Sequence, residues 1–244
     1  ARRLKAPYVE AKTRVFPDGE SKITFGRIPK NSIVLVVQST YPPVDTNLLQ
    51  ALSIISQVRK VSSKIYAIIP YMGYARQDRQ FLSGEVVTMS IIARMIQAAG
   101  AKKVVAVDIH SKTALNHFKI PKENVSAIPE LAKYFKKMKL KNALVVSPDM
   151  GGSLRAKKFA SLLNIDFIAL KKSRNRNTGK VQIHSSKADV RGKDLILVDD
   201  IISTGGSIIK AAQFLKRQKC KRLFVACTHG LFVEDAEKKI KKAG

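Results

Sequence analysis

The sequence predicts an α/β protein in which parallel sheets are flanked by helices, arranged in two successive units. Short apolar runs typical of buried strands alternate with segments of helical periodicity along the whole chain. Such alternation implies parallel strands joined by right-handed helical crossovers. Clusters of polar residues directly follow several of the predicted strands, where open α/β sheets bind ligands. We expect a domain boundary near residue 128, which gives domains of residues 1–128 and 129–244.

The strands of the first unit are predicted from β-rich or apolar runs at residues 8–15, 33–38, 64–70 and 103–110. The Pro-Asp-Gly core of residues 16–20 predicts a turn after the first of them. Helices are expected from Asp45 or Thr46, either of which can cap, to about Lys60, and from about Val87 to Ala99, before Gly100. Residues 71–79 form a loop in this scheme, and the segment through Pro121 is irregular.

The second unit is expected to begin with a lysine-rich helix at about residues 129–138. Its predicted strands are residues 143–147, 166–170, 181–184, 194–198 and 222–227. Helices follow to Leu163, from near Ile208 to about Gln218, and at the basic C-terminal end. The stretch 171–180 is polar, very basic and free of helical periodicity, so it is predicted to be a mobile loop.

Composition limits the class of protein. The 244 residues are 45% hydrophobic, which is ample for a core, yet no apolar run approaches the roughly 18 residues of a membrane span. The first residues are not followed by the apolar core of a signal peptide. Cys220 and Cys227 lack CxxC spacing and fit reduced thiols. We therefore expect a cytoplasmic protein that does not associate with membranes.

The charge is unusual, because 45 Lys and Arg residues face 18 Asp and Glu residues, a formal net charge of +27. Basic surfaces bind phosphate backbones without any sequence motif, so a nucleic-acid-binding protein is a rival interpretation. However, the excess is spread along the chain, Trp is absent, and neither an RNA-recognition aromatic signature nor zinc-finger spacing occurs. We do not expect nucleic acid to be the principal partner, and the charge excess has no explanation in the sequence.

The most informative stretch is Asp194–Ser207, DLILVDDIISTGGS. Its apolar run ends in two adjacent acids, and a Ser/Thr/Gly loop then opens a helix, where backbone amides and the helix N-terminus favour an anion. The acids suit the hydroxyls of a sugar whose phosphate lies in the loop, which predicts a phosphorylated ribose as the ligand. The stretch resembles the PRPP-binding signature that type I phosphoribosyltransferases share with ribose-phosphate diphosphokinases.

Four further motifs precede this stretch in order: FPDGE at 16–20, YARQDR at 74–79, VDIH at 107–110 and PDMGG at 148–152. With them, nearly the whole chain resembles the ribose-phosphate diphosphokinases, or PRPP synthetases, and looks closest to archaeal members. The resemblance implies two tandem phosphoribosyltransferase-like, Rossmann-like domains in a dimer-based homo-oligomer. It also implies a reaction in which MgATP transfers diphosphate to the C1 hydroxyl of ribose 5-phosphate, giving PRPP and AMP.

The resemblance assigns roles to residues of both substrates' sites. Asp199 and Asp200 are implied to bind the ribose hydroxyls. The 5-phosphate loop is implied to consist of Ser203, Thr204, Gly205, Gly206 and Ser207. The implied ATP-binding residues are Phe16, Asp18, Glu20, Arg76 and Gln77, the first three reaching the adenine site of a neighbouring subunit.

The remaining implied roles concern the diphosphate, the metal and catalysis. Asp149, Gly151 and Gly152 are implied to line the diphosphate. His110 and Asp149 are implied to be associated with Mg²⁺, which keeps several waters and needs few protein ligands. Lys172 and Arg174 are implied to be the catalytic pair, because cations on a closing loop meet developing charge and exclude water.

The sequence departs from the family pattern in several places. Many members carry an acid in place of Ser203 and Ala in place of Gly205. The chain is also expected to start after the family's first strand and to stop before its closing strand and helix. Three alternatives stay open: a type I phosphoribosyltransferase, a catalytically silent regulatory subunit of the same fold, and a nucleic-acid-binding protein. Oligomer size, allosteric regulation and donor specificity are not predicted.

Overall fold

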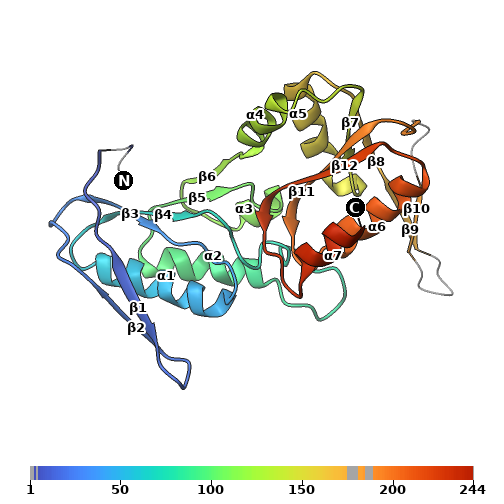
Figure 1. The fold of residues 1–244 in the computed structure, drawn as a ribbon. Coiled ribbons are helices and arrows are strands. Elements are labelled where there is room, and N and C mark those ends of the chain that lie inside the picture. The colour runs from blue at the N-terminus through green and yellow to red at the C-terminus, as the bar shows by residue number, and fades with distance from the viewer. Residues whose placement is uncertain (1–2, 4, 175–180, 185–188, 244) are drawn as a thin grey trace. The chain divides into compact units, whose positions relative to one another are not determined.

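The computed structural model divides the chain into two compact units, Ala1–Val125 and Ser126–Gly244, close to the expected boundary at residue 128 (Figure 1). It describes residues 3, 5–174, 181–184 and 189–243, with the backbone alone for 172–174 and 181–184. Within this described part, no helix is both long enough and apolar enough to cross a membrane. Both units contain a parallel sheet with helices packed on it, as the sequence predicts.

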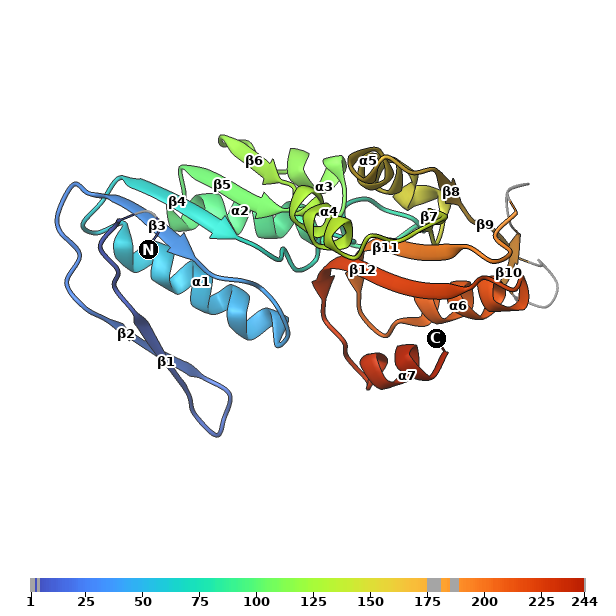
Figure 2. The ribbon, with the colours of Figure 1, turned by 45° about the horizontal axis from the view of Figure 1, so that its top comes forward.

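The sheet of the first unit has the strand order β3-β4-β5-β6, and all its pairings are parallel. The strands are β3 (Ile33–Val37), β4 (Lys64–Ile69), β5 (Lys103–Val107) and β6 (Lys122–Val125). Helices α1 (Val44–Val58) and α2 (Thr88–Ala99) pack on one face, where Ile55, Ile65 and Ile96 are completely buried (Figure 2). On the other face of β3, Ile33, Leu35 and Val37 are exposed.

An antiparallel hairpin precedes this sheet. Strands β1 (Ala11–Val15) and β2 (Ser21–Phe25) pair with Val15 opposite Ser21. The expected turn at residues 16–20 is present, and its amide groups close it through Phe16 N to Glu20 O (2.8 Å) and Gly19 N to Phe16 O (2.9 Å). The hairpin is tied to α1 because the Gln50 side-chain amide donates to Ser21 Oγ at 3.1 Å.

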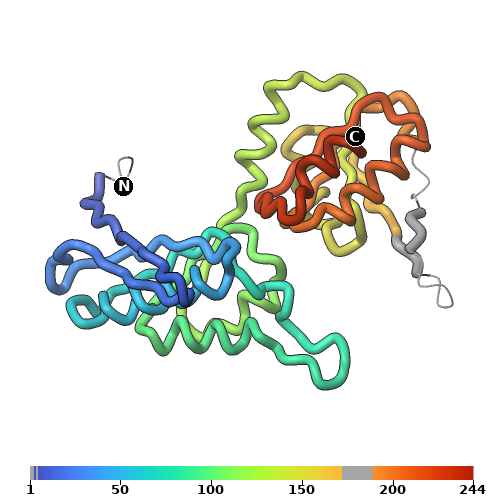
Figure 3. Tube along the Cα trace, turned by 60° about the horizontal axis from the view of Figure 1, so that its bottom comes forward, coloured from blue at the N-terminus to red at the C-terminus, as the bar shows by residue number. Residues whose placement is uncertain are grey.

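The sheet of the second unit has the order β12-β11-β7-β8, again with parallel pairings throughout. Its strands are β7 (Ala143–Ser147), β8 (Phe167–Ala169), β11 (Asp194–Ile202) and β12 (Arg222–Gly230). Helices α4 (Ile128–Lys137) and α5 (Ser153–Leu163) bury one face, and α6 (Gly206–Arg217) buries the other. The last helix, α7 (Ala236–Ala243), packs against α6 (Figure 3).

The strands of this sheet differ in length at their carboxyl ends. Strand β11 pairs with β7 from Asp194 opposite Ala143 to Leu197 opposite Val146. It pairs with β12 much further, to Ile202 opposite Gly230. Residues 199–202 of β11 therefore extend beyond its ladder with β7, on the side where the segment after β7 turns into α5.

Three elements of the first unit differ from the sequence prediction. Strand β2 was not predicted. The segment through Pro121 is not irregular, because it contains α3 (Lys112–Asn116), and β6 follows it directly. Helix α3 is only five residues long, and it is fixed by a cap in which the Ala114 amide donates to Ser111 Oγ at 2.9 Å. The predicted cap of α1 is also wrong, since Pro43 is the N-cap residue and no side chain caps that end.

Three strands of the second unit also differ from the prediction. The predicted loop at 171–180 is wrong for Lys171–Arg174, which forms β9 and pairs antiparallel with β10 (Val181–His184); residues 175–180 lie outside the described residues. Backbone pairing with β10 stabilises β9 although its sequence, KKSR, carries no strand signal. Strand β12 continues three residues past Cys227, and β11 continues past its two acids to Ile202.

Phe159 of α5 is the position at which we expect the second core to be most sensitive to truncation. Its side chain is completely buried and its ring lies edge-on to that of Phe135, with centroids 5.6 Å apart. Phe159→Ala should lower the free energy of unfolding by about 3–5 kcal/mol, because it leaves a cavity. Urea unfolding of the whole chain measures this loss, and hydrogen exchange localises it to residues 126–243. Tyr134→Ala, at a 65% exposed side chain, is the control and should cost far less.

Candidate functional site

Two adjacent carboxylates lie on the extension of β11 and share one cation. Arg155, in the first turn of α5, places Nη1 3.4 Å from Asp199 Oδ1 and Nη2 3.1 Å from Asp200 Oδ2. Asp199 Oδ1 also accepts a 2.9 Å hydrogen bond from the Asp200 amide. All three side chains are largely buried, with 18% of Arg155, 19% of Asp199 and 6% of Asp200 exposed. The pair is thus a partly desolvated, preorganised set of oxygen acceptors.

The electrostatics of this pair are dominated by burial. Desolvation has the largest effect and, together with the hydrogen bond and the charge of Asp200, raises the pKa of Asp199 to about 7. The positive charge of Arg155 opposes this rise because it favours the ionised carboxylate. Cys227, opposite Asp199 on β12, has its pKa raised to about 11 by burial and by the two acids, so it is a neutral thiol. A ligand that prefers ionised acceptors should therefore bind with release of a proton from this pair.

The expected phosphate loop joins β11 to α6. Ser203 is partly buried, whereas Thr204, Gly206 and Ser207 are exposed. Gly205 is buried in a left-handed conformation (φ 76°), and its carbonyl accepts the Ile209 amide at 2.8 Å, which starts the helix. A Cβ on Gly205 would lie 2.9 Å from Ile240 Cδ1, so the packing of α7 gives this chain a local reason for glycine. The helix N-terminus favours an anion at this loop.

The expected diphosphate loop follows β7, the neighbouring strand of β11. Asp149 caps the short 3₁₀ turn at Met150–Gly152, because its Oδ1 accepts the Gly152 amide at 3.2 Å. The completely buried Ser147 donates its hydroxyl to Asp149 O at 2.6 Å. Gly152 has no room for a side chain, since an added Cβ would lie 2.6 Å from Ser147 Oγ and 3.4 Å from Arg155 Nη1. The sheet therefore brings both loops and the acid pair to one edge.

Lys172 and Arg174, the expected catalytic pair, belong to β9, which begins two residues after β8 ends. The Leu170 amide, immediately before β9, donates to Ser147 O at 3.0 Å and so ties this connection to the end of β7. The backbone of the pair thus leaves the sheet at the edge that carries the two loops. The side chains of Lys172 and Arg174 lie outside the described part of the structure.

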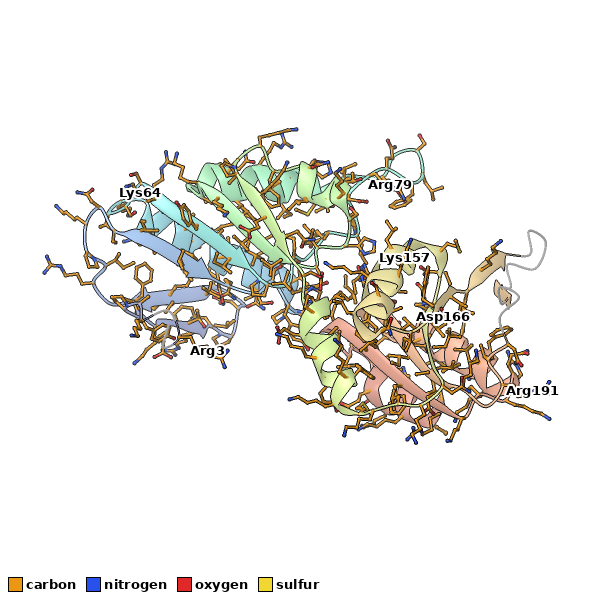
Figure 4. The ribbon with its side chains drawn as sticks, turned by 90° about the horizontal axis from the view of Figure 1, so that it is seen from above. Arg3, Lys64, Arg79, Lys157, Asp166 and Arg191 are labelled. Atoms are coloured by element: carbon orange, nitrogen blue, oxygen red, sulfur yellow. The ribbon has the colours of Figure 1, made fainter. Side chains whose placement is uncertain are left out.

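Arg76 and Gln77, the expected nucleotide residues of the first unit, are exposed on the loop between β4 and α2. The Gln77 carbonyl accepts the Met89 amide at 3.2 Å, and its side-chain oxygen accepts the Thr88 hydroxyl at 2.9 Å. Further along the loop lies Arg79, which is labelled in Figure 4. Its guanidinium carbon is 4.9 Å from the centre of the Phe81 ring. The loop backbone is therefore anchored while Arg76 faces solvent.

Asp78, to which the sequence analysis gave no role, is the main anchor of this loop. It is 5% exposed, and its carboxylate accepts a short hydrogen bond from the Ser111 hydroxyl. Its carbonyl lies 2.7 Å from His117 Nε2. Because Ser111 follows His110 directly, Asp78 connects the loop carrying Arg76 with the loop that follows β5.

Phe16, Asp18 and Glu20 lie at the tip of the hairpin in the first unit. The Phe16 ring is half-buried beneath the guanidinium of Arg14, whose central carbon is 5.1 Å from the ring centre. Asp18 Oδ1 accepts the Glu20 amide at 3.1 Å, and both acids are exposed. Hydrogen bonding within the turn explains Asp18, whereas no described contact of this unit explains the charge of Glu20.

The expected metal residues belong to different units: His110 is exposed after β5, and Asp149 is half-buried after β7. Asp108, two residues before His110, has a left-handed backbone (φ 40°), and its amide donates to Val125 O at 2.8 Å. Within the part of the chain that the structure describes, no three His, Cys, Asp or Glu side chains form a cluster able to hold a metal ion. A metal here would need ligands from water or substrate.

Sequence reasoning missed Arg155 and Asp78. Arg155 lies three residues after Gly152, in a helix that also contains Lys157 and Lys158. From the sequence alone, it is therefore interpreted as an ordinary solvated charge. Its signal is positional, since residues in the first helical turn after a strand-loop segment lie at the carboxyl edge of the sheet. Asp78 directly follows Gln77, which was given a role, yet its burial is apparent only in the folded structure.

Comparison with known proteins covers the whole chain. Residues 1–100 match the N-terminal domain of ribose phosphate pyrophosphokinase, and residues 122–243 match the phosphoribosyl transferase domain. The chain is 36% identical over 243 residues to a ribose-phosphate pyrophosphokinase of Sulfurisphaera tokodaii, covering 99% of this chain and 83% of that protein. Identity is also 36% over 248 residues to the ribose-phosphate pyrophosphokinase of Methanopyrus kandleri, covering 100% and 84%.

Solved structures agree with this result. The phosphoribosylpyrophosphate synthetase from Mycobacterium smegmatis superimposes with a TM-score of 0.89 at 30% sequence identity, covering 100% of this chain and 80% of that one. Because the superposition covers the full chain, the structural similarity includes both units. The two-unit α/β fold predicted from the sequence is therefore confirmed.

Gly152 offers a test of the packing at the carboxyl edge of the second sheet. Gly152→Ala should destabilise the protein by about 1–3 kcal/mol, because the methyl group would press on Ser147 Oγ in a well-packed site. The substitution should also displace Arg155 and so lower the affinity for any ligand that the two acids bind. Thermal unfolding and ligand binding measure the two effects. Gly26→Ala, where an added Cβ would meet Val9 Cγ1 at an ordinary 3.7 Å, should change neither.

Proposed function

Because the chain belongs to the ribose-phosphate pyrophosphokinase family, we propose that it transfers diphosphate from MgATP to the C1 hydroxyl of ribose 5-phosphate, giving PRPP and AMP. The observation that carries the proposal is the carboxyl edge of the second sheet. There Asp199 and Asp200 stand between an anion-binding loop at the start of α6 and the Asp149–Gly152 turn.

The sugar would be held by charge complementarity along its length. Asp199 and Asp200 are acceptors, and ionised carboxylates form stronger hydrogen bonds with hydroxyls than neutral groups do. The 5-phosphate would lie in the loop of Ser203 to Ser207, where hydroxyls, backbone amides and the N-terminus of α6 favour an anion. A sugar without the phosphate would lose its contacts with the loop, and a phosphate without the sugar would lose the hydrogen bonds to the two acids. This arrangement selects a phosphorylated ribose.

The transfer itself requires positioning and stabilisation of charge, since little covalent chemistry falls to the protein. We assign Asp149, Gly151 and Gly152 to the diphosphate, because their turn lies on the strand next to the acid pair. Lys172 and Arg174 would supply positive charge to the transferred group from β9. One such preorganised group is worth on the order of 10²–10³ in rate.

The nucleotide would bind residues of the first unit. Arg76 is exposed on an anchored loop, and its planar guanidinium suits bidentate contact with a phosphate. Gln77 supplies an adjacent amide. Phe16, Asp18 and Glu20 are assigned to the adenine, with the Phe16 ring as the stacking surface. We propose that the hairpin carrying them serves the site of a neighbouring subunit in a dimer-based homo-oligomer.

A magnesium ion fits this set of residues as a companion of ATP. Mg²⁺ prefers oxygen ligands, keeps several waters and is commonly bound by one or two carboxylates together with substrate phosphates. Asp149 offers a half-buried carboxylate beside the proposed diphosphate site, and the described residues contain no cluster for a protein-only cage. We propose that Asp149 and His110, each within its own unit, are associated with Mg²⁺, as the family resemblance implies, and that the ion would neutralise charge on the phosphates.

The thiols bear on the compartment that we propose for the protein. Both Cys220 and Cys227 are free, and burial raises the pKa of each, so neither is a reactive thiolate. These properties fit a reducing compartment, and we propose that the enzyme acts in the cytoplasm, without a membrane partner and without nucleic acid as its principal ligand.

The proposed reaction is tested by mixing the protein with MgATP and ribose 5-phosphate. AMP and PRPP should form in equal amounts, and only when sugar phosphate, ATP and Mg²⁺ are all present. Chelation of Mg²⁺ should stop the reaction, and its return should restore it. AMP formation without the sugar, or PRPP consumption driven by a nucleobase, would contradict the proposal. Tight DNA or RNA binding with a steep salt dependence, unaffected by substrates, would favour a nucleic-acid-binding protein.

The role of the acid pair is tested by the isosteric double substitution Asp199→Asn/Asp200→Asn. Loss of charge-assisted hydrogen bonds to the sugar should raise the KM for ribose 5-phosphate by at least about tenfold per acid, with a much smaller effect on the KM for ATP. Steady-state kinetics at varied sugar concentration measure the change. Asp235→Asn is the control, because Asp235 is an exposed acid of the same unit whose ion pair with Lys238 is on the surface.

A further inference from the structure

We propose that Arg155 is a positioning residue for the sugar phosphate, one that holds Asp199 and Asp200 in the arrangement needed to bind it. This inference rests on the proposed function of the acid pair and extends it to a residue of the neighbouring helix. The pattern that identified the other site residues did not single out Arg155. Three structural observations support the assignment.

The first observation concerns the geometry of a strand. Consecutive residues of a regular strand direct their side chains to opposite faces. In β11 the Asp200 amide donates to Asp199 Oδ1 at 2.9 Å, which draws the first carboxylate toward the second residue. Arg155 contacts both, with one terminal nitrogen for each acid, at 3.4 Å and 3.1 Å. The planar guanidinium presents its donors in a fixed fork. One cation therefore bridges both carboxylates and fixes one oxygen of each relative to the other.

The second observation is that Arg155 is in an unfavourable place for a cation. It lies in the first turn of α5, where the helix dipole disfavours positive charge, and that turn contains no acid to compensate. Only 18% of its side chain is exposed, so it also loses hydration. Residues that break such a local rule often do so at functional sites. The acids of β11 are the compensation that the structure provides.

The third observation is the absence of a side chain at Gly152, which completes the contact. An added Cβ at Gly152 would lie 3.4 Å from Arg155 Nη1 and 2.6 Å from Ser147 Oγ. Side chains in a helix lean toward its N-terminus, so Arg155 extends back toward the ends of β7 and β11. The Asp149–Gly152 turn therefore provides the space through which the guanidinium reaches the acids. Arg155 thus links the proposed diphosphate loop to Asp199 and Asp200.

The charges around Asp199 show what Arg155 controls. Asp200 on the same strand opposes ionisation of Asp199, Arg155 on α5 favours it, and Cys227 on β12 is a neutral thiol. Removal of the cation would leave two buried carboxylates side by side and would shift the pair toward a shared proton. A protonated acid is a weaker acceptor for a sugar hydroxyl. Arg155 should therefore matter most at low pH and for the sugar substrate.

The test compares Arg155→Met with Arg155→Lys and with Lys157→Met. Lys157 is an exposed cation two residues further along α5, so its loss removes the same charge without touching the acids (Figure 4). Arg155→Met should raise the KM for ribose 5-phosphate by at least about tenfold and leave the KM for ATP within about twofold. Arg155→Lys should recover part of the loss because it restores the charge without the fork. Lys157→Met should behave as wild type.

The pH profile separates positioning from a general effect on folding. In Arg155→Met, the acidic limb of kcat/KM for ribose 5-phosphate should move to higher pH, because the acids lose their cation. A purely structural role would lower activity at every pH alike and would raise both KM values. An unshifted limb, an unchanged KM for the sugar, or equal rises in both KM values would overturn the proposal.

Two safeguards keep the test decisive. If Arg155→Met does not fold, Arg155→Lys is compared with the wild type instead. A wild-type KM and pH profile in Arg155→Lys would contradict the proposal that the two donors of the guanidinium are needed. If the wild-type protein forms no PRPP, the proposed function fails, and calorimetric binding of ribose 5-phosphate then tests Arg155 by itself. Sugar-phosphate binding that is equally tight in wild type and Arg155→Met would reject the positioning role.

Discussion

The unequal reach of β11 along its two neighbours is the constraint on which the candidate site depends. Its ladder with β7 ends at Leu197, whereas its ladder with β12 continues to Ile202. The acids thus lie where one side of the strand is no longer occupied by hydrogen bonds to β7. The chain leaving β7 turns in that space and enters α5. Strand β12 pairs with the extension from the other side, so the segment that carries the acids remains part of the sheet. Backbone pairing thus sets where this segment lies, and Arg155 contacts the two carboxylates that it carries.

The first unit presents polar side chains in a different manner. Its loop after β4 is held from beneath by the buried Asp78, which connects it to Ser111 and His117. Arg76 and Gln77 are exposed on top of this support. The second unit buries its acids together with their partner, whereas the first exposes a cation on a rigid loop. Under the proposed function, this difference would suit the two substrates, because a triphosphate would carry its own charge and metal whereas a sugar would need precisely placed acceptors.

The sequence predicted the elements with strong hydrophobic patterns and missed those without one. The buried strands β4, β7 and β11 and the helices that cover them have clear apolar periodicity. Strand β6 is entirely exposed, α3 has only five residues, and β9 is a run of basic and polar residues that exists through its pairing with β10. Residues of the site were predicted where they belong to contiguous motifs. Arg155 was missed because its role arises from a contact across 44 positions of sequence, which no local pattern encodes.

The buried acid pair also affects the stability of the fold. A carboxyl group whose pKa is higher in the folded than in the unfolded chain favours folding while it is protonated. For Asp199 this contribution is complete below its ordinary pKa of 3.8 and is lost as the pH rises through about 7. Ionisation, which makes the group a better acceptor for a ligand, thus reduces the folding free energy of the empty protein. Because the substrate binds the ionised form, substrate binding and folding stability both depend on the protonation of Asp199. Bound substrate would therefore protect this enzyme against unfolding most strongly in alkaline solution, where the group is ionised.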